Sequence, residues 1–504
     1  NMKEAEMRFS AIAILAILSL SSTLSAVEVS LPRSSPEAQG VSSERLLDVI
    51  NALDEQFPSM HGVMIVRHGH VVAEGWWAPY KAEYNHVLYS LSKSFTSTAL
   101  GLAVSEGKVS IDDRVIDIFP DSVPAEVSNN LKQMRVRDLL TMSTGHQDEP
   151  SAAADFVSVK TFLAQPVPHI PGTHFKYNTA ATFMQSAIVQ KVTGATVLDY
   201  LRPRLFEPLG IEHPVWDTNF QGISLGGYGL RVRTEDIAKF GQLYLQQGNW
   251  QGQQLVPADW VQLATSKQVS NGSDPANDWN QGYGFQFWRC RHNAYRGDGA
   301  FGQYCVVLPD QDAVVAINSG VGNMQAVLNV LWHHLLPAFE AKPLMPNAAA
   351  HDALKNKLAQ LSIDFPDGAA TSTSAQQIDK TYQFSDNPFQ LRSLQLKAED
   401  NNKMSLALTV GEQTAKLVAA NGEWQTGTVL LPLGRGPQPQ SEPAASAFAW
   451  PSPDTLVVKA CAIETPFEIT YTLQLNGDTV ELTGRTNVGF GNTQIGPVQA
   501  TVRQ

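Results

Sequence analysis

Cysteine is scarce in this 504-residue sequence, which contains only Cys290, Cys305 and Cys461. Three widely separated cysteines exclude a small disulfide-rich fold and any cysteine-rich zinc module. Charged residues make up 17% of the chain and hydrophobic residues 43%, a balance typical of soluble globular proteins that excludes disorder as the main state. The length predicts two domains.

Positive charge is in deficit. The chain has 36 Lys and Arg against 48 Asp and Glu, which gives a formal net charge of -12. Binding to nucleic acid depends on concentrated Lys and Arg that neutralise phosphates. We therefore expect no nucleic-acid partner.

Long hydrophobic runs are lacking except near the start of the sequence. Lys3 and Arg8 precede an apolar run over residues 11–20, and small and polar residues follow as far as Ala26. This order is typical of a secretory signal peptide, and the run is short for a membrane span. We expect residues 1–26 to be a signal peptide rather than an uncleaved anchor. The remaining chain is then periplasmic or secreted, with no stable membrane insertion.

Export would expose the cysteines to an oxidising compartment. Cys290 and Cys305 lie in neighbouring strand-like runs, so a disulfide between them is one hypothesis. The other is that all three cysteines are small buried hydrophobic residues. The sequence does not give the Cα separation that a disulfide needs, and both hypotheses stay open.

Residues 27–345 have the pattern of one α+β domain. Residues 63–77 predict a hairpin, and later strand-like runs cover 283–288, 303–308 and 313–318. Helical periodicity lies between them: after Ser90, over 179–191, and after Thr234, which we expect to be an N-cap. Strands at both ends with helices between them predict an antiparallel sheet flanked by helices.

The pattern changes in the last third of the chain. Residues 346–377 predict a short helix and then a linker rich in Pro, Gly, Ala, Ser and Thr. Beyond it, apolar residues alternate, and Asn476-Gly477 lies between two alternating runs, which is a strong hairpin signal. We expect residues 378–504 to form a separate all-β domain, a barrel or a sandwich. It braces the first domain or forms a lid over its pocket, and both roles stay open.

The sequence Ser90-Leu91-Ser92-Lys93 carries the main chemical prediction. At the start of a helix, residues i and i+3 share a face, so the Ser90 hydroxyl and the Lys93 amine can meet. Free backbone N–H groups and the positive end of the helix dipole favour the negative charge that develops when a serine attacks a carbonyl. A lysine can serve as the base if burial lowers its pKa below ~10.4.

Two other serine motifs are less convincing. Ser105 and Lys108 repeat the spacing, but Gly107 predicts that the helix ends there, where its dipole has the wrong sign. The segment Gly222–Gly226 matches the nucleophile elbow of α/β-hydrolases, which needs a buried strand before it and a helix after it. Polar residues precede it and more glycines follow, so a glycine-rich loop is the better interpretation.

Tyr177 stands just before the predicted helix over residues 179–191. A tyrosine can act as a general base when neighbouring cations stabilise its phenolate, and Lys93 would supply such a cation. A tyrosine in the core or at a helix end is the ordinary alternative.

Four blocks of the sequence, in their order along the chain, resemble the serine β-lactamase and penicillin-binding-protein family. The similarity is to its branch of class C β-lactamases, related esterases and D-aminopeptidases. The blocks are Tyr89–Phe95, Val136–Gly145, Pro171–Asn178 and Gly226–Ile237. The resemblance covers roughly residues 35–340. It implies a β-lactamase/transpeptidase-like fold for that region and a small-molecule or peptide-like substrate, with no cofactor.

The resemblance also implies roles for single residues. Ser90 would be the acylated nucleophile, and Lys93 and Tyr177 would transfer its proton. The family's third motif falls on Gly297-Asp298-Gly299, which puts the oxyanion hole at the backbone N–H groups of Ser90 and Ala300. Asn178 or Thr179, together with these three residues, would bind substrate.

The third motif departs from the family pattern because it lacks a cation and contains Asp298. An acidic group repels a substrate carboxylate. We therefore predict a secreted serine hydrolase that prefers neutral or amine-bearing amides or esters to β-lactams. A penicillin-binding DD-peptidase or β-lactamase is the enzymatic alternative, and a non-catalytic relative that binds peptidoglycan or another partner is the second. The histidines have no spacing that predicts a metal site.

Overall fold

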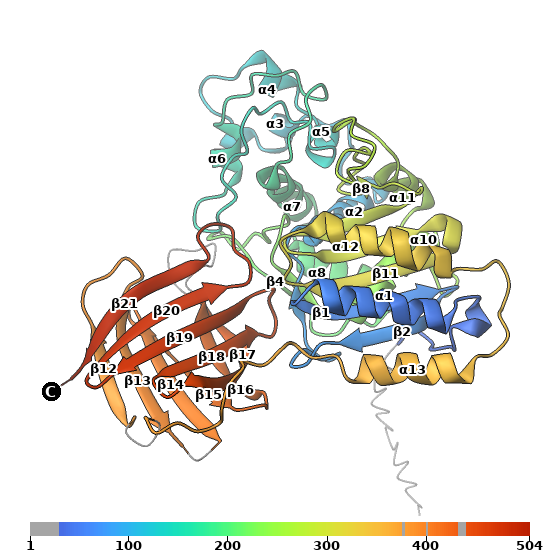
Figure 1. Cartoon of the computed structure of the whole chain (residues 1–504). Helices are drawn as coiled ribbons and strands as arrows, with labels where there is room; N and C mark the ends of the chain where they lie inside the picture. Colours follow the sequence, from blue (N-terminus) through green and yellow to red (C-terminus); the bar gives the residue numbers. More distant parts are fainter. Residues whose placement is uncertain (1–29, 375–377, 400–401, 432–439, 504) are drawn as a thin grey trace, which may run out of the picture.

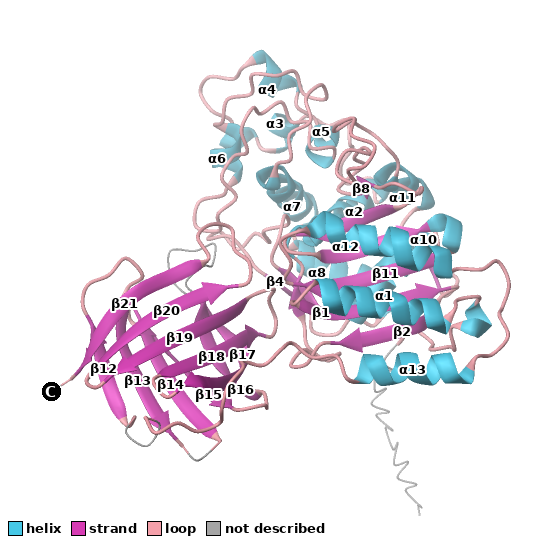
Figure 2. Ribbon diagram, viewed as in Figure 1, coloured by secondary structure: helices cyan, strands magenta, loops and turns pink. Residues whose placement is uncertain are grey.

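The computed structural model describes residues 30–503, except 375–377, 400–401 and 432–439. The predicted signal peptide therefore lies outside the described residues. Two domains lie side by side, a mixed α and β domain and a barrel, as Figures 1 and 2 show. In the described part of the chain, no helix has both the length and the apolar character needed to cross a membrane.

The first domain is built on a six-stranded sheet, counted over the described residues, in which every neighbouring pair is antiparallel. Its order is β2-β1-β11-β10-β9-β8, so the first hairpin pairs directly with the last strand, as predicted. The strands are β1 (Met60–Arg67), β2 (His70–Trp76), β8 (Trp288–Arg289), β9 (Tyr295–Gly299), β10 (Gln303–Leu308) and β11 (Ala313–Ser319).

Helices cover both faces of this sheet. Successive side chains of β1, β10 and β11 point to opposite faces, and they pack with these helices in two separate hydrophobic cores. Met64 and Val307 pack in one core with the helices α2, α7 and α10, whereas Val63 and Val306 pack in the other with α1, α12 and α13. These helices are α1 (Ser43–Gln56), α2 (Ser92–Ser105), α7 (Thr179–Thr193), α10 (Thr234–Leu245), α12 (Met324–Val330) and α13 (Ala348–Ala359).

Shorter elements complete the first domain. The short helices are α3 (Val115–Ile118), α4 (Asn129–Gln133), α5 (Val136–Leu140), α6 (Val159–Leu163), α8 (Val197–Leu201), α9 (Glu207–Leu209) and α11 (Ala258–Thr265). The short strands are β3 (His86–Val87), β4 (Val215–Trp216), β5 (Leu230–Val232), β6 (Asn249–Trp250) and β7 (Gln253–Gln254).

Two local predictions are wrong. Residues 283–288 do not form a strand, since Tyr283 makes only isolated bridges and β8 begins at Trp288. Thr234 is the first residue of α10 and not its N-cap, which is Arg233. The Thr234 hydroxyl donates to Asn318 Oδ1 instead, because a buried polar partner on β11 lies within reach.

The second domain is a closed β-barrel, which settles the choice between barrel and sandwich. Neighbouring strands pair antiparallel from β15 through β12 and β21 to β17, and a parallel bridge between Ala420 and Ala447 closes the ring. The strands are β12 (Lys380–Phe384), β13 (Leu391–Ala398), β14 (Lys403–Val410), β15 (Gln413–Ala420), β16 (Gln425–Leu431), β17 (Gln440–Ser452), β18 (Thr455–Ala462), β19 (Glu468–Asn476), β20 (Thr479–Thr486) and β21 (Gln494–Val502).

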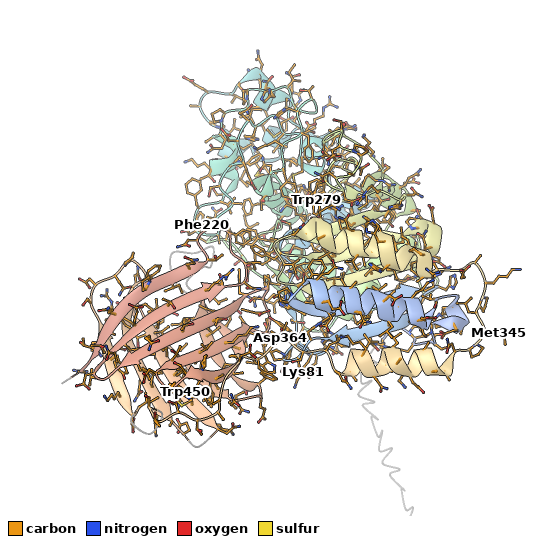
Figure 3. The ribbon with its side chains drawn as sticks, viewed as in Figure 1. Lys81, Phe220, Trp279, Met345, Asp364 and Trp450 are labelled. Carbon is orange, nitrogen blue, oxygen red and sulfur yellow. The ribbon has the colours of Figure 1, made fainter. Side chains whose placement is uncertain are left out.

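Alternation along the barrel strands explains its core. Leu394, Leu406 and Leu473 are buried inside, and the predicted Asn476-Gly477 turn joins β19 to β20. Figure 3 places Asp364 at the junction of the two domains and Trp450 within the barrel. The predicted α+β domain with an antiparallel sheet, followed by an all-β domain, is confirmed.

Candidate active site

The start of α2 brings Ser90 and Lys93 together. A single 3-10 turn, Tyr89–Leu91, leads directly into α2, so the two residues lie on the same face. Lys93 Nζ donates a hydrogen bond to Ser90 Oγ over 3.1 Å. The predicted proximity of the two side chains is thus confirmed. Ser90 is partly exposed and lines a pocket.

Lys93 is buried, with 1% of its surface exposed. Besides Ser90, its amine donates to the backbone oxygen of Gly227 over 2.8 Å and to Thr179 Oγ1 over 3.4 Å. A side chain at residue 227 would take this space, because its Cβ would lie 3.4 Å from Nζ and 2.6 Å from Thr179 Cγ2. The glycine therefore lets the backbone approach Lys93 and direct its amine toward Ser90.

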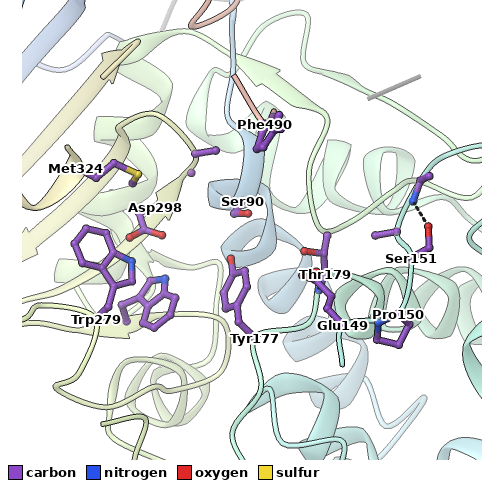
Figure 4. Close-up of a pocket in the computed structure, with 15 residues that line it drawn as sticks. Ser90, Glu149, Pro150, Ser151, Tyr177, Thr179, Trp279, Asp298, Met324 and Phe490 are labelled. Carbon is purple, nitrogen blue, oxygen red and sulfur yellow. Dashed lines mark hydrogen bonds between the residues drawn. The ribbon is translucent and has the colours of Figure 1, made fainter. Parts of the chain in front are cut away.

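The ring of Tyr177 lies against the amine of Lys93. Lys93 Nζ is 5.0 Å from the centroid of the tyrosine ring, and the ring stacks on Trp288 with centroids 5.4 Å apart. Figure 4 shows the phenol oxygen pointing toward Ser90. Ser90 and Tyr177 therefore line the same pocket, and the Lys93 amine lies against both side chains. A serine nucleophile with two proton-transfer groups needs these three groups close together.

The end of β9 forms the wall next to Ser90. Asp298, Gly299 and Ala300 line the pocket together with Ser90. Gly299 approaches the nucleophile closely, because a Cβ on it would lie 1.9 Å from Leu88 O and 3.1 Å from Ser90 N. The backbone of Gly299 thus lies against the segment that leads into Ser90, and Ala300, the next residue, lines the same pocket as Ser90.

We expect Gly299→Ala to lower kcat by about 100-fold, comparable to the loss of one oxyanion-hole donor, because the added methyl forces β9 away from Ser90. Gly322→Ala is the matched control, since a Cβ there meets nothing within 4 Å. Ester hydrolysis and thermal unfolding of both variants provide the measurement. Wild-type kcat in Gly299→Ala would contradict this geometry.

Asp298 is paired inside the protein with Arg296. Both side chains are buried, and Arg296 Nε and Nη2 each lie 2.9 Å from Asp298 Oδ2. Burial raises the pKa of Asp298, while the charge and hydrogen bonds of Arg296 act in the opposite direction. The guanidinium also lies over the Trp279 ring, with its carbon 4.3 Å from the ring centroid. The guanidinium of Arg296 is therefore paired with Asp298 and does not line the pocket.

The pocket has a volume of about 710 Å³, and its charged lining residues, among those described, are Glu149 and Asp298. Glu149 accepts a hydrogen bond of 2.7 Å from the backbone N–H of Thr179. The remaining walls are largely aromatic or apolar, and some of their residues are labelled in Figure 4. The lining residues that sequence analysis missed include Glu149, Trp279, Trp288, Met324 and Phe490.

Two predicted substrate-binding residues do not line the pocket. Asn178 is fully buried, and its side chain caps α7 by accepting a hydrogen bond from the N–H of Ala181. Gly297 packs against α2, where a Cβ would lie 2.4 Å from Leu91 Cδ1 and 2.6 Å from Ser94 Oγ. Any side chain at residue 297 would meet this crowding. Thr179, Asp298 and Gly299 do line the pocket.

The disulfide hypothesis is wrong in this structure, where Cys290 and Cys305 are free and buried. Cys290 belongs to the core that contains α1, and Cys305 to the core that contains α10. The two thiols thus lie on opposite faces of the sheet. The alternative, buried hydrophobic cysteines, is the one that the structure supports. Across the described ranges, no group of three or more His, Cys, Asp or Glu is placed to share a metal ion.

Comparison with known proteins identifies the family of this chain. Residues 46–328, more than half of the chain, match the Beta-lactamase family. The chain belongs to the beta-lactamase family. The family relationship predicted from the sequence blocks is thereby confirmed, and the matched region contains Ser90, Lys93 and Tyr177.

Relatives of this beta-lactamase-family chain carry several names. An Escherichia coli (strain K12) protein provisionally named D-alanyl-D-alanine carboxypeptidase is 26% identical over 41% of this chain and 56% of its own length. The 6-aminohexanoate-dimer hydrolase of Paenarthrobacter ureafaciens is 23% identical over 54% of this chain and 74% of its own. The chain thus spans little more than half the length of some curated relatives that it matches.

A solved structure also aligns with the chain. It is the octameric penicillin-binding protein homologue from Pyrococcus abyssi, with a TM-score of 0.48 and 14% identity. The alignment covers 91% of this beta-lactamase-family chain and 99% of the other.

Proposed function

We propose that this chain is a serine hydrolase that forms a covalent acyl-enzyme on Ser90. Its substrates are amides or esters whose acyl part is neutral or carries an amine. The observation that carries the proposal is the 3.1 Å hydrogen bond from Lys93 Nζ to Ser90 Oγ, on the wall of a pocket that Tyr177 shares. A module that only binds a partner has no need for this trio.

The proposed reaction uses these contacts. Ser90 Oγ attacks the substrate carbonyl carbon and gives its proton to the Lys93 and Tyr177 pair. The N–H groups of Ser90 and Ala300 stabilise the oxyanion. When the tetrahedral adduct collapses, the leaving amine or alkoxide takes the proton and departs, and the acyl group stays on Ser90. Water then attacks the ester with the same groups acting as base, which releases the acid and restores the serine.

The charge of the pocket supports the choice of substrate. Both of its charged lining residues among those described, Glu149 and Asp298, are acidic, and Arg296 is buried against Asp298. No cation is among the described lining residues to bind a substrate carboxylate, and Glu149 would repel one, while an amine would meet Glu149 and aromatic rings. Relatives named for D-aminopeptidase and lovastatin esterase activity are consistent with amide and ester substrates.

Three aryl esters of matched length test this preference: butyrate, 4-aminobutyrate and hemisuccinate. We expect kcat/KM for the hemisuccinate to be at least about tenfold below the other two, the ratio that ~1.4 kcal/mol of repulsion gives. The Glu149→Gln variant keeps a side-chain oxygen that accepts from the Thr179 N–H but loses the negative charge. It should therefore reduce the difference in kcat/KM between the hemisuccinate and the other two esters. A clear preference for the hemisuccinate or for a cephalosporin would reject the substrate class and favour the alternative below.

The alternative is a penicillin-binding DD-peptidase or β-lactamase. It is favoured by relatives named as a penicillin-binding protein and, provisionally, as a D-alanyl-D-alanine carboxypeptidase. Both activities act on substrates that bear a carboxylate, which the acidic pocket disfavours.

We also propose that the enzyme acts in the periplasm or outside the cell. The support is the basic start, the short apolar run over residues 11–20, and the small and polar residues that follow as far as Ala26. Cell fractionation tests the location. Sequencing the N-terminus of the recovered protein tests the signal peptide, since a start at Val27 supports cleavage and an intact leader contradicts it.

A further inference from the structure

The loop between β20 and β21, residues 487–493, brings a residue of the barrel to the pocket that Ser90 lines. Phe490 of this loop lines the same pocket as Ser90, although it belongs to the other domain. Figure 4 shows Phe490 and Tyr177 on opposite sides of Ser90. A substrate held at Ser90 therefore meets a side chain of the barrel.

Phe490 belongs to an aromatic cluster that joins the two domains. The cluster consists of Phe467 and Phe490 from the barrel and Tyr89 and Phe301 from the first domain. Ring centroids of Phe490 lie 5.3 Å from Tyr89 and 4.8 Å from Phe301. Those of Phe467 lie 6.4 Å from Tyr89 and 5.8 Å from Phe301. Most of these pairs are edge-to-face, a geometry that aromatic rings prefer.

Tyr89 and Phe301 hold special positions along the chain. Tyr89 directly precedes Ser90, and Phe301 directly follows Ala300, so each adjoins one of the two expected oxyanion-hole donors. Both have left-handed backbone conformations, with φ of 45° and 66°. Non-glycine residues adopt this conformation at a cost in free energy and keep it only where their surroundings fix it. Here the surroundings include two phenylalanines of the barrel.

The loop that presents Phe490 is itself anchored to the first domain. Asn487 Nδ2 donates to Ser59 Oγ over 2.8 Å and to the backbone oxygen of Gly320 over 3.0 Å. Its Oδ1 accepts from the backbone N–H of Glu468 over 2.8 Å. One amide side chain thus fixes the start of the loop to both domains, three residues before Phe490.

We propose that the barrel is part of the catalytic unit. Phe467 and Phe490 act as positioning residues that fix the backbone of Tyr89 and Phe301, and thereby the N–H groups of Ser90 and Ala300. Phe490 also forms a wall for the acyl part of the substrate, so its size sets the largest acyl group accepted. This inference rests on the proposed hydrolase function and assigns a role to a domain outside the matched family region.

Phe467 tests the positioning role, because it is buried and does not line the pocket. We expect Phe467→Leu to lower kcat by about 10–100-fold with KM changed less than about twofold, an effect at or below the loss of an oxyanion donor. The affinity for a boronic acid that forms a tetrahedral adduct on Ser90 should fall by a similar factor. Phe448→Leu is the matched control, since Phe448 is a buried barrel phenylalanine outside the cluster and should keep wild-type kinetics.

Substitution of Phe490 tests whether this side chain limits the size of the acyl group. Because 46% of Phe490 is exposed, we expect its variants to fold. We expect Phe490→Ala to lower kcat/KM for an aryl acetate at least about fivefold. It should raise the ratio of octanoate to acetate kcat/KM by about tenfold, the equivalent of ~1.4 kcal/mol. Phe490→Leu should fall between Phe490→Ala and the wild type.

The outcomes separate this inference from the proposed function. If wild-type protein is not labelled by a fluorophosphonate, the hydrolase proposal fails. If wild-type protein is labelled and Phe490→Ala keeps both the wild-type rate and the wild-type chain-length profile, the role of the barrel is overturned. Equal kinetics in Phe467→Leu and Phe448→Leu overturn the positioning role even if Phe467→Leu is less stable.

Discussion

Replacing Ser90 by alanine should abolish ester hydrolysis, with a fall in kcat of about 10⁴–10⁶-fold, the usual consequence of removing a serine nucleophile. The reason is that no covalent intermediate forms without Oγ, while the pocket and the Lys93 amine remain. The substitution removes one partly exposed hydroxyl, so thermal unfolding should change little. Residual activity above about 1% of the wild type would assign the chemistry to another group.

The chain supplies its own control for this experiment. Ser105 and Lys108 have the same spacing as Ser90 and Lys93, but Ser105 is the last residue of α2 and its hydroxyl donates to the carbonyl of Leu102. Lys108 Nζ lies 3.8 Å from Glu106 Oε2. Ser105→Ala should therefore retain wild-type kcat and should still be labelled by a fluorophosphonate.

Lys93→Arg should lower kcat by about 10²–10⁴-fold, because an arginine keeps the charge but does not release a proton at ordinary pH. Lys93→Met removes both the charge and the proton and should lose at least as much. The measurement is the single-turnover rate of acylation across pH, with circular dichroism to establish that both variants fold. If Lys93→Arg acylates at more than about a tenth of the wild-type rate, the lysine supplies only charge and the proton goes elsewhere.

Sequence predicted the local parts of the fold best. The β1–β2 hairpin, the Asn476-Gly477 turn and the helix after Ser90 depend on periodicity and turn residues within a few positions of each other. The failed predictions depended on tertiary contacts. Thr234 pairs with Asn318 instead of capping its helix, and the two cysteines lie on opposite faces of a sheet that no spacing rule reveals.

The same division applies to the site. The contact between Ser90 and Lys93 follows from one helical turn, whereas Tyr177 was expected near them mainly because of the family resemblance. Glu149, Trp279 and Phe490 gave no local signal, because each reaches the pocket through the packing of distant segments. The Gly226-Gly227 pair could have predicted one contact of the site, because paired glycines often mark a place where the backbone closely approaches another group. Here the backbone oxygen of Gly227 accepts a hydrogen bond from Lys93.

The central claim is that Ser90 becomes acylated, and mass spectrometry tests it most directly. Wild-type protein is mixed with a fluorophosphonate, or with an aryl ester whose acyl group leaves the enzyme slowly, and is then quenched in acid. The masses of the intact protein and of its proteolytic peptides are measured. We predict one adduct per chain, on the peptide that contains Ser90, which is absent in Ser90→Ala and present in Ser105→Ala. An adduct on another residue, or turnover of ester with no adduct on Ser90 at any time, would contradict the account.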